Sequence, residues 1–136
     1  MIAHVFGKEG CSKCAALKRR VEQLTGTAEY AGVKMVYHDV MTLDGIVEFC
    51  KADCLNPNRI PALLMSDDEG NYCRSGRRLS STKAEDFADS VTYQWVGVQT
   101  DYDHGGGVIT PVMVRDVFEK AAVVCRRDEA LPHAGA

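Results

Sequence analysis

Features that would identify a secreted, membrane-spanning or nucleic-acid-binding protein are missing from this sequence of 136 residues. The N-terminus does not combine a basic start with a long apolar stretch, so no secretory signal is visible. No apolar run approaches the ~20 residues that a membrane-spanning helix needs. We therefore expect a cytoplasmic protein that has no membrane partner.

Positive charge is not in excess either. The chain contains 16 Lys and Arg against 19 Asp and Glu, which gives a formal net charge of -3. Because nucleic acid is bound by clustered cationic surfaces, this balance argues against a nucleic-acid partner. The sequence contains no internal repeat and no low-complexity tract. Its 46% hydrophobic and 26% charged residues are typical of a globular domain with a single core.

The apolar residues recur with the spacing of an α/β domain in the order β, α, β, α, β, β. The predicted elements are strands at residues 2–6, 33–40 and 60–65, a short hairpin strand at 72–74, and helices at 12–25 and 43–54. A hairpin after two βα units predicts a mixed central sheet. On the second helix, we expect Ile46, Val47, Cys50 and Cys54 to form the buried stripe.

The chain from residue 81 onward is predicted to be a C-terminal extension. Its predicted elements are a helix at residues 82–90, a helix or strand at 93–98 and, after a Gly-rich loop, an amphipathic helix at 110–125 followed by a frayed end. We expect residues 1–80 to form the core and residues 81–136 to pack on it. The extension is also the predicted surface for a partner or for a homodimer.

The six cysteines carry the most specific signal. Without a secretory signal, they favour catalytic, redox or metal-binding thiols over a structural disulfide framework. Cys11 and Cys14 form a CxxC motif between the first strand and the first helix. The positive end of the helix dipole, with Lys8 and Lys13 nearby, should lower the pKa of Cys11. Cys14, one turn away, is placed to attack a mixed disulfide at Cys11.

Metal binding is the alternative chemistry for the same thiols. Cys11, Cys14, Cys50 and Cys54 together form a C-x2-C and a C-x3-C pair, and four thiolates suffice for zinc or an iron-sulfur cluster. The simpler interpretation of Cys50 and Cys54 is that both are small buried residues. The strand-to-helix context of the CxxC favours redox chemistry over zinc. The other two cysteines, in the predicted hairpin and the last helix, have no predicted role.

The first strand, the segment from Lys8 to Cys14, the two βα units and Arg59-Ile60-Pro61 before a hairpin together resemble the thioredoxin/glutaredoxin superfamily. The resemblance covers roughly residues 1–80 and is closer to glutaredoxins, because the first strand opens the chain. It implies a thioredoxin-like fold in which a cis-proline loop packs beside the CxxC motif. It also implies that Cys11 is the nucleophile and Cys14 the resolving thiol.

The same resemblance implies a substrate site. Lys8 matches a lysine that stabilises the thiolate and binds a glutathione carboxylate, and the site is lined by Ser12, Lys13, Ile60 and Pro61. Two features depart from glutaredoxins: the pair Ser12-Lys13 between the cysteines, and Ser-Gly-Arg-Arg where the family has a Gly-Gly segment that holds glutathione.

We therefore expect a thiol-disulfide oxidoreductase with no cofactor beyond its redox-active disulfide, and keep glutathione as an alternative. The expected partners are a disulfide-containing protein or small thiol as substrate, and a reductase. The hypotheses from other classes are a zinc or iron-sulfur module and a redox-sensing interaction domain.

Overall fold

The computed structural model describes residues 1–51, 59–73, 96–100 and 108–130, with side chains in the last range described to residue 125. These residues form an α/β fold with one mixed four-stranded sheet and three α-helices. The elements are β1 (Ile2–Gly7), α1 (Ser12–Thr25), a short 3-10 helix (Ala28–Tyr30), β2 (Lys34–Asp39), α2 (Leu43–Lys51), β3 (Ala62–Ser66), β4 (Gly97–Gln99) and α5 (Pro111–Ala130). Within these ranges, no helix has both the length and the apolar content needed to cross a membrane.

The sheet has the strand order β2-β1-β3-β4. β1 runs parallel to β2 and antiparallel to β3, and β4 runs antiparallel to β3. In this register Phe6 of β1 lies between His38 of β2 and Ala62 of β3. The carboxyl end of β1 therefore lies beside the start of β3, which brings two segments distant in sequence to one edge of the sheet.

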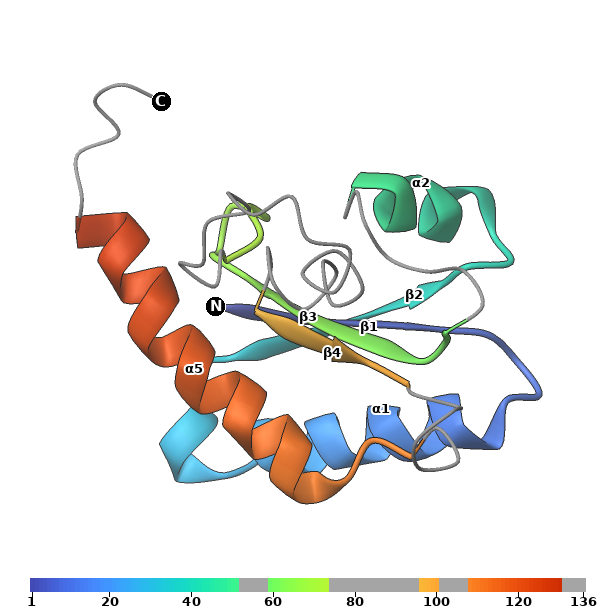
Figure 1. Ribbon diagram of the computed structural model, residues 1–136, viewed down its shortest axis with the longest axis horizontal. Helices are drawn as coiled ribbons and strands as arrows, with labels where there is room; N and C mark the ends of the chain where they lie inside the picture. The colour runs from blue at the N-terminus through green and yellow to red at the C-terminus, as the bar shows by residue number, and fades with distance from the viewer. Residues whose placement is uncertain (52–58, 74–95, 101–107, 131–136) are drawn as a thin grey trace, which may run out of the picture.

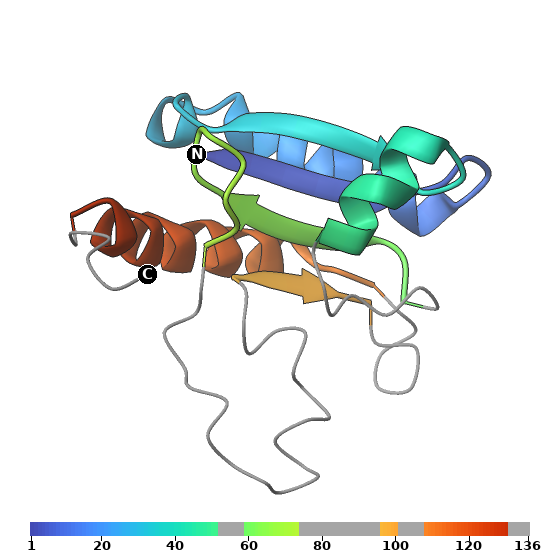
Figure 2. The same ribbon diagram turned by 90° about the horizontal axis from the view of Figure 1, so that it is seen from above.

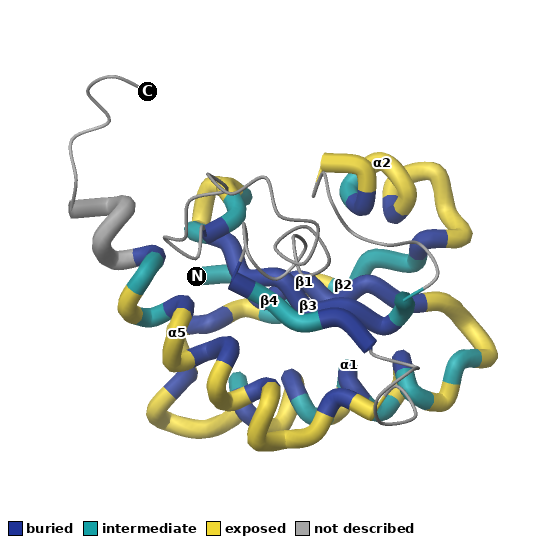
Figure 3. The backbone as a smooth tube through the Cα atoms, viewed as in Figure 1, coloured by how far each residue is buried: buried dark blue, intermediate teal, exposed yellow. Residues whose placement is uncertain are grey.

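Helices cover both faces of the sheet. Figures 1 and 2 show α1 and α5 on one face and α2 on the other. The larger apolar cluster lies between the sheet and the helices α1 and α5, and a smaller cluster lies beneath α2. The helices turn their exposed residues outward, while the strands between them are largely buried (Figure 3). The result is a three-layer arrangement.

Alternation along β1 explains why both layers depend on this strand. Ala3 and Val5 belong to the cluster under α1 and α5, whereas Phe6 belongs to the cluster under α2. Successive side chains of a strand point to opposite faces, so His4 lies on the same face as Phe6. His4 itself is only 5% exposed. β1 is thus buried on both faces, as its apolar sequence predicts.

The predicted stripe on the second helix is wrong. Ile46 and Val47 are 44% and 47% exposed, and Cys50 is exposed as well. The buried residues of α2 are Gly45 and Phe49. A side chain at Gly45 would overlap the carbonyl oxygen of Asp39, so the absence of a side chain is what lets this face of α2 lie against the end of β2. Cys54, the fourth predicted member of the stripe, lies outside the described residues.

The second antiparallel strand also differs from the prediction. Tyr72 forms only an isolated bridge with Ser66, and Arg74 lies outside the described residues. The strand that pairs with β3, from Ala62 to Leu64, is β4. Its first two residues belong to the segment 93–98, where the sequence allowed either a helix or a strand, and Gln99 was predicted to begin the Gly-rich loop. The predicted helix at 82–90 lies outside the described part of the chain. α5 continues five residues past the predicted end at Cys125, to Ala130, through residues that are mostly good helix formers.

Cys73 and Cys125, for which no role was predicted, are joined by a disulfide. The expectation that the cysteines are reactive thiols and not structural disulfides is therefore wrong for this pair. Their Cα atoms are 5.3 Å apart, and 52 positions separate them in sequence. Both residues are almost fully buried, with exposures of 2% and 3%. The bond ties α5 to the segment that follows β3, and so fastens the last helix to the sheet.

We predict that Gly45→Ala lowers the free energy of unfolding. The added methyl group has no space beside the Asp39 backbone, and the cost of overpacking, about 1–3 kcal/mol, should exceed the gain in helix propensity. Urea denaturation followed by circular dichroism measures the change. Gly32→Ala is the matched control, because a side chain there meets nothing within 4 Å. Equal midpoints for the two variants would contradict the close packing of α2 on β2.

We also predict that replacing Cys73 and Cys125 together by Ala destabilises the fold. Opening a loop of this length, with 52 positions between its ends, should remove roughly 2–4 kcal/mol of stability. The same denaturation experiment, made without reductant, measures the loss. Cys50→Ser is the control, since this thiol is exposed and unbonded and should leave the midpoint unchanged. A double variant as stable as the wild type would show that the bond contributes nothing.

Candidate functional site

The CxxC motif lies where β1 passes into α1. Cys11 is the N-cap of α1 and has an extended backbone, with φ -97° and ψ 108°. Its sulfur accepts a hydrogen bond from the backbone N–H of Cys14 at 3.2 Å. The two cysteines form a disulfide, and their Cα atoms are 5.2 Å apart. A sulfur atom at the N-cap lies beside the unpaired N–H groups of the first helical turn and at the positive end of the helix dipole.

The two sulfurs differ in accessibility. Cys14 is fully buried and belongs to the buried face of α1, whereas Cys11 is half-buried. Ser12 between them is exposed, and Lys13 is half-buried. A substrate can therefore reach the motif from the side of Cys11, while Cys14 is shielded.

Cys14 packs against a glycine at the end of β1. A side chain at Gly7 would meet the Tyr37 hydroxyl at 2.6 Å and the Cβ of Cys14 at 2.9 Å. Burial, reinforced by Asp39 and Glu9, raises the pKa of Tyr37, so its hydroxyl remains protonated at neutral pH. The ammonium group of Lys18 lies 5.2 Å from the centre of the Tyr37 ring. The sequence patterns identified neither Gly7 nor Tyr37 as a site residue, although glycine is the residue that allows such a close approach.

The predicted proline segment lies at the same edge of the sheet. The peptide bond between Ile60 and Pro61 is cis. Because Phe6 pairs with Ala62, Pro61 comes next to the end of β1, from which the loop to Cys11 departs. Pro61 is buried and Ile60 is half-buried. The cis bond, which the resemblance implied, is thus present.

Only some of the predicted site residues are brought together by the fold. Lys8 is exposed in the loop between β1 and α1, and Ser12 and Lys13 follow in the first turn of α1. Sequence proximity alone brings these residues near Cys11. The fold adds Pro61 to this edge through the pairing of β1 with β3.

The predicted four-cysteine metal set is not assembled among the described residues. Cys11 and Cys14 are bonded to each other, Cys50 is exposed on α2, and Cys54 lies outside the described part of the chain. The prediction that Cys50 is a buried small residue is wrong, because the buried face of α2 is formed by other residues.

A different group of ligand-type side chains meets on the α2 face of the sheet. Ligand atoms of His4, His38 and Glu48 lie within 4.8 Å of one another, and no other described His, Cys, Asp or Glu residues form such a group of three. With Lys51 and Tyr72, they line a hollow of about 540 Å³. α1, which carries Cys14, covers the opposite face, so this group is separate from the CxxC motif. A histidine inside the apolar run of β1 was the sequence signal for it.

Burial keeps both imidazoles of this group neutral. Burial, followed by the neighbouring His38, lowers the pKa of His4 to about 4, although Glu48 acts in the opposite direction. Burial also lowers the pKa of His38. Glu48 raises this pKa and Lys51 lowers it, and the effect of burial is the largest. Burial alone would raise the pKa of Glu48, but a hydrogen bond from Tyr72 and the nearby Lys51 lower it. At neutral pH the group therefore holds two neutral imidazoles and one carboxylate.

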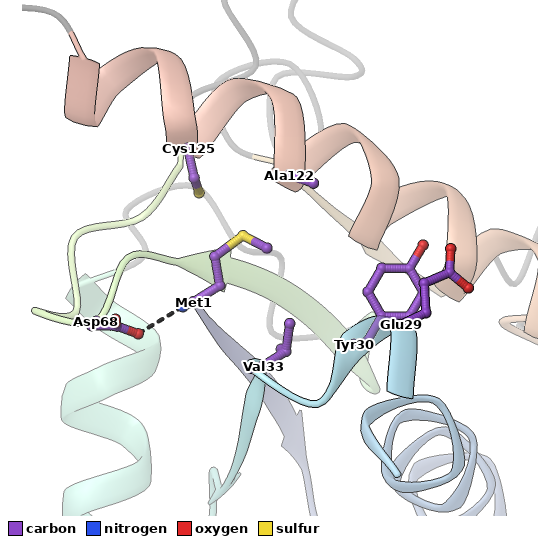
Figure 4. Close-up of a pocket in the computed structure, with 8 residues that line it drawn as sticks. Met1, Glu29, Tyr30, Val33, Asp68, Ala122 and Cys125 are labelled. Carbon is purple, nitrogen blue, oxygen red and sulfur yellow. Dashed lines mark hydrogen bonds and ion pairs between the residues drawn. The ribbon is translucent and has the colours of Figure 1, made fainter. Parts of the chain in front are cut away.

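A second hollow, of about 310 Å³, lies at the opposite end of the sheet from the CxxC motif. Figure 4 shows the N-terminal amino group of Met1 paired with Asp68 at its rim, with Cys125 of α5 and Tyr30 on other sides. Tyr30 packs edge-on against Phe118. Tyr30, Phe118 and Cys125 belong to the larger apolar cluster, so this hollow lies at the edge of the packing between α5 and the sheet.

Comparisons with protein-family models, with curated proteins and with solved structures found no match for this chain.

We predict that the unfolding free energy of the metal-free protein rises with pH between about 4 and 6.5. The folded-state pKa of His4, about 4, lies below its ordinary value of 6.5, so the unfolded chain binds more protons in this window. The stabilisation is complete above pH 6.5 and is lost as the pH falls toward 4. Its size for His4 is at most about 3 kcal/mol.

Urea unfolding at a series of pH values, in buffer containing a chelator, measures this dependence. The carboxylates of the chain also titrate at low pH, so wild type is compared with His4→Gln, which keeps an amide able to hydrogen-bond. The variant should show a flatter profile in the same window. Parallel profiles for the two proteins would contradict the buried neutral state of His4.

Proposed function

We propose that this chain is a thiol-disulfide oxidoreductase with a thioredoxin-like fold, closest to the glutaredoxin type. The observation that carries the proposal is the pair of bonded sulfurs at the start of α1, one half-buried and one fully buried. The order of β1, α1, β2, α2 and β3, the antiparallel β4 and the cis Ile60–Pro61 bond support the proposed fold. Substrate contact is assigned to Lys8, Ser12, Lys13, Ile60 and Pro61, as the family resemblance implies.

The position of Cys11 explains how its thiolate would be activated. The N-cap sulfur faces the backbone N–H of Cys14 and the positive end of the dipole of α1, both of which favour the anion over the thiol. A thiolate is the form that attacks a disulfide. Since Cys14 is buried, the incoming disulfide meets Cys11 first.

The proposed reaction proceeds in two exchanges. The Cys11 thiolate attacks one sulfur of a substrate disulfide, forming a mixed disulfide and releasing the other substrate sulfur as a thiolate. The Cys14 thiol, on losing its proton, then attacks the Cys11 sulfur. This step closes the Cys11–Cys14 bond and releases the second substrate sulfur. The substrate has gained two electrons, and the protein has become the oxidised form described above.

The reduced form is restored by two thiols from a reductase or from a small thiol such as glutathione. The substrate class proposed is a disulfide-containing protein or a low-molecular-weight disulfide, and the compartment proposed is the cytoplasm. In the described form the chain needs no further cofactor for this exchange, because both electrons are carried by the cysteine pair.

We predict that Cys11→Ser abolishes disulfide-reductase turnover, with a loss of at least ~100-fold, because the attacking sulfur is gone. Turnover is measured on a small disulfide, bis(2-hydroxyethyl) disulfide, and on a protein disulfide, with dithiothreitol as electron donor. When the reduced Cys14→Ser variant is incubated with the disulfide in the absence of dithiothreitol, the reaction should stop after the first exchange, and intact-protein mass spectrometry should detect the mixed disulfide that accumulates. Cys50→Ser is the matched control, since this exposed thiol is outside the site.

Two results would refute the proposal. One is stoichiometric metal bound by the reduced cysteines of the wild type without any turnover. The other is a Cys11 thiol whose alkylation follows an unperturbed pKa near ~8.5, because the proposed activation would then be absent.

A further inference from the structure

The group formed by His4, His38 and Glu48 is unusual because of where it lies. This face of the sheet is otherwise packed with apolar side chains, among them Phe6, Phe49 and Leu64. Polar groups placed among such residues are costly unless they are hydrogen-bonded. Here three polar side chains line one hollow, and their ligand atoms lie within 4.8 Å of one another.

Hydrogen bonds fix the orientation of His4. The Ser66 hydroxyl donates to the backbone carbonyl of Asp67 at 2.9 Å, so its oxygen accepts from Nε2–H of His4 at 2.7 Å. This assignment places the lone pair of His4 on Nδ1. Metal-binding histidines in proteins have the same arrangement, with one nitrogen free to ligate and the other held by a hydrogen bond.

His38 faces that lone pair directly. Nε2 of His38 lies 2.8 Å from Nδ1 of His4, and because Nδ1 is the acceptor, Nε2 of His38 carries the proton in this form. The two rings are nearly parallel, with 7° between their planes. Moving this proton to the other nitrogen of His38 leaves two lone pairs, one on each ring, directed at the same point.

Glu48 supplies the charge. Its Oε1 accepts a hydrogen bond from the Tyr72 hydroxyl at 2.7 Å, which orients the carboxylate toward the hollow. Its Oε2 lies 3.4 Å from the ammonium group of Lys51, whose side chain is 64% exposed and can move away. One carboxylate and two neutral imidazoles form a donor set that several divalent transition metals accept.

We propose that Nδ1 of His4, Nε2 of His38 and the Glu48 carboxylate bind a divalent transition metal ion of the zinc and iron class. Three protein ligands leave at least one coordination position for water or a small molecule, which enters through the hollow. Two residues outside the ligand set orient the ligands by hydrogen bonds: Tyr72 orients the Glu48 carboxylate, and Ser66 orients the His4 imidazole. The site is independent of the CxxC motif and of its proposed reaction.

Binding requires the ligands to rearrange around the ion. Tetrahedral zinc ligands at about 2.0–2.1 Å from the metal stand roughly 3.3–3.5 Å apart. The two imidazole nitrogens must therefore separate slightly from the 2.8 Å of their hydrogen bond, and the carboxylate must approach. Glu48 belongs to α2 and His38 to β2, and both side chains are partly exposed, so these two are the ligands that move toward the ion while Ser66 holds His4.

Zn²⁺ binding to the full, tag-free chain in its oxidised form tests the proposal. In this form Cys11 and Cys14 are bonded and cannot act as thiolate ligands. Isothermal titration should show one saturable equivalent. Glu48→Gln should weaken binding by at least ~100-fold, because it removes the anionic ligand but keeps an oxygen that accepts from Tyr72, and His38→Ala should do the same. Tyr72→Phe should cost roughly 10-fold, as expected for a residue that positions a ligand.

Glu69→Gln is the matched control, because Glu69 lines the same hollow but is not one of the three ligands, and its binding should equal that of wild type. Co²⁺ in place of Zn²⁺ should give visible bands without thiolate charge transfer in the near ultraviolet. The proposal is overturned if wild type binds Zn²⁺ more weakly than about 100 µM, or if Glu48→Gln binds as tightly as wild type. It is equally overturned if Cys50→Ser is the variant that abolishes binding.

Discussion

The double-sided burial of β1 is the constraint on which the rest of the structure depends. β1 lies inside the sheet, parallel to β2 on one side and antiparallel to β3 on the other. One set of its side chains packs under α1 and α5, and the alternate set packs under α2. A shift of one residue in its register would exchange the two faces, moving His4 into the larger core and Val5 out of it. Both candidate sites therefore depend on this one pairing.

The two sites use different ends and faces of the same strand. The carboxyl end of β1 leads into the loop that places Cys11 at the start of α1, and Gly7 at that end allows Cys14 to pack closely. The middle of β1 carries His4 on the other face, beneath α2. Because α1 and α2 lie on opposite faces (Figure 2), chemistry at the cysteine pair and ligand binding at the histidines need not share space.

The sequence predicted those elements whose position depends on local residue spacing alone. The boundaries of α1 follow from a regular apolar spacing that ends at Gly26, and the expected helix coincides with the observed Ser12–Thr25. β1 was predicted from a short, largely apolar run that ends at Gly7. The position of the CxxC motif at the strand-to-helix junction follows from these two elements, because nothing but a short loop separates them.

Predictions failed where tertiary contacts, which a local pattern does not contain, decide the outcome. The face of α2 depends on Gly45 touching the backbone of Asp39, so the more hydrophobic Ile46 and Val47 remain exposed. β4 is a strand because β3 offers it an open edge. The histidine group joins residues from β1, β2 and α2, and the bond between Cys73 and Cys125 spans 52 positions. His4 within the apolar run of β1 was a signal that one polar side chain is buried, but sequence spacing does not indicate the partners in any of these contacts.

The contrast in solvent access between the two disulfides has a consequence for the order in which they open. A reductant must reach a sulfur in line with the bond. Cys11 is half-buried at a helix start, whereas both members of the other bond lie in the main core, at 2% and 3% exposure. Mild reductants should therefore open the first bond and spare the second. The proposed exchange between dithiol and disulfide at Cys11 and Cys14 would then leave the Cys73–Cys125 bond intact, and this bond would continue to hold α5 against the sheet.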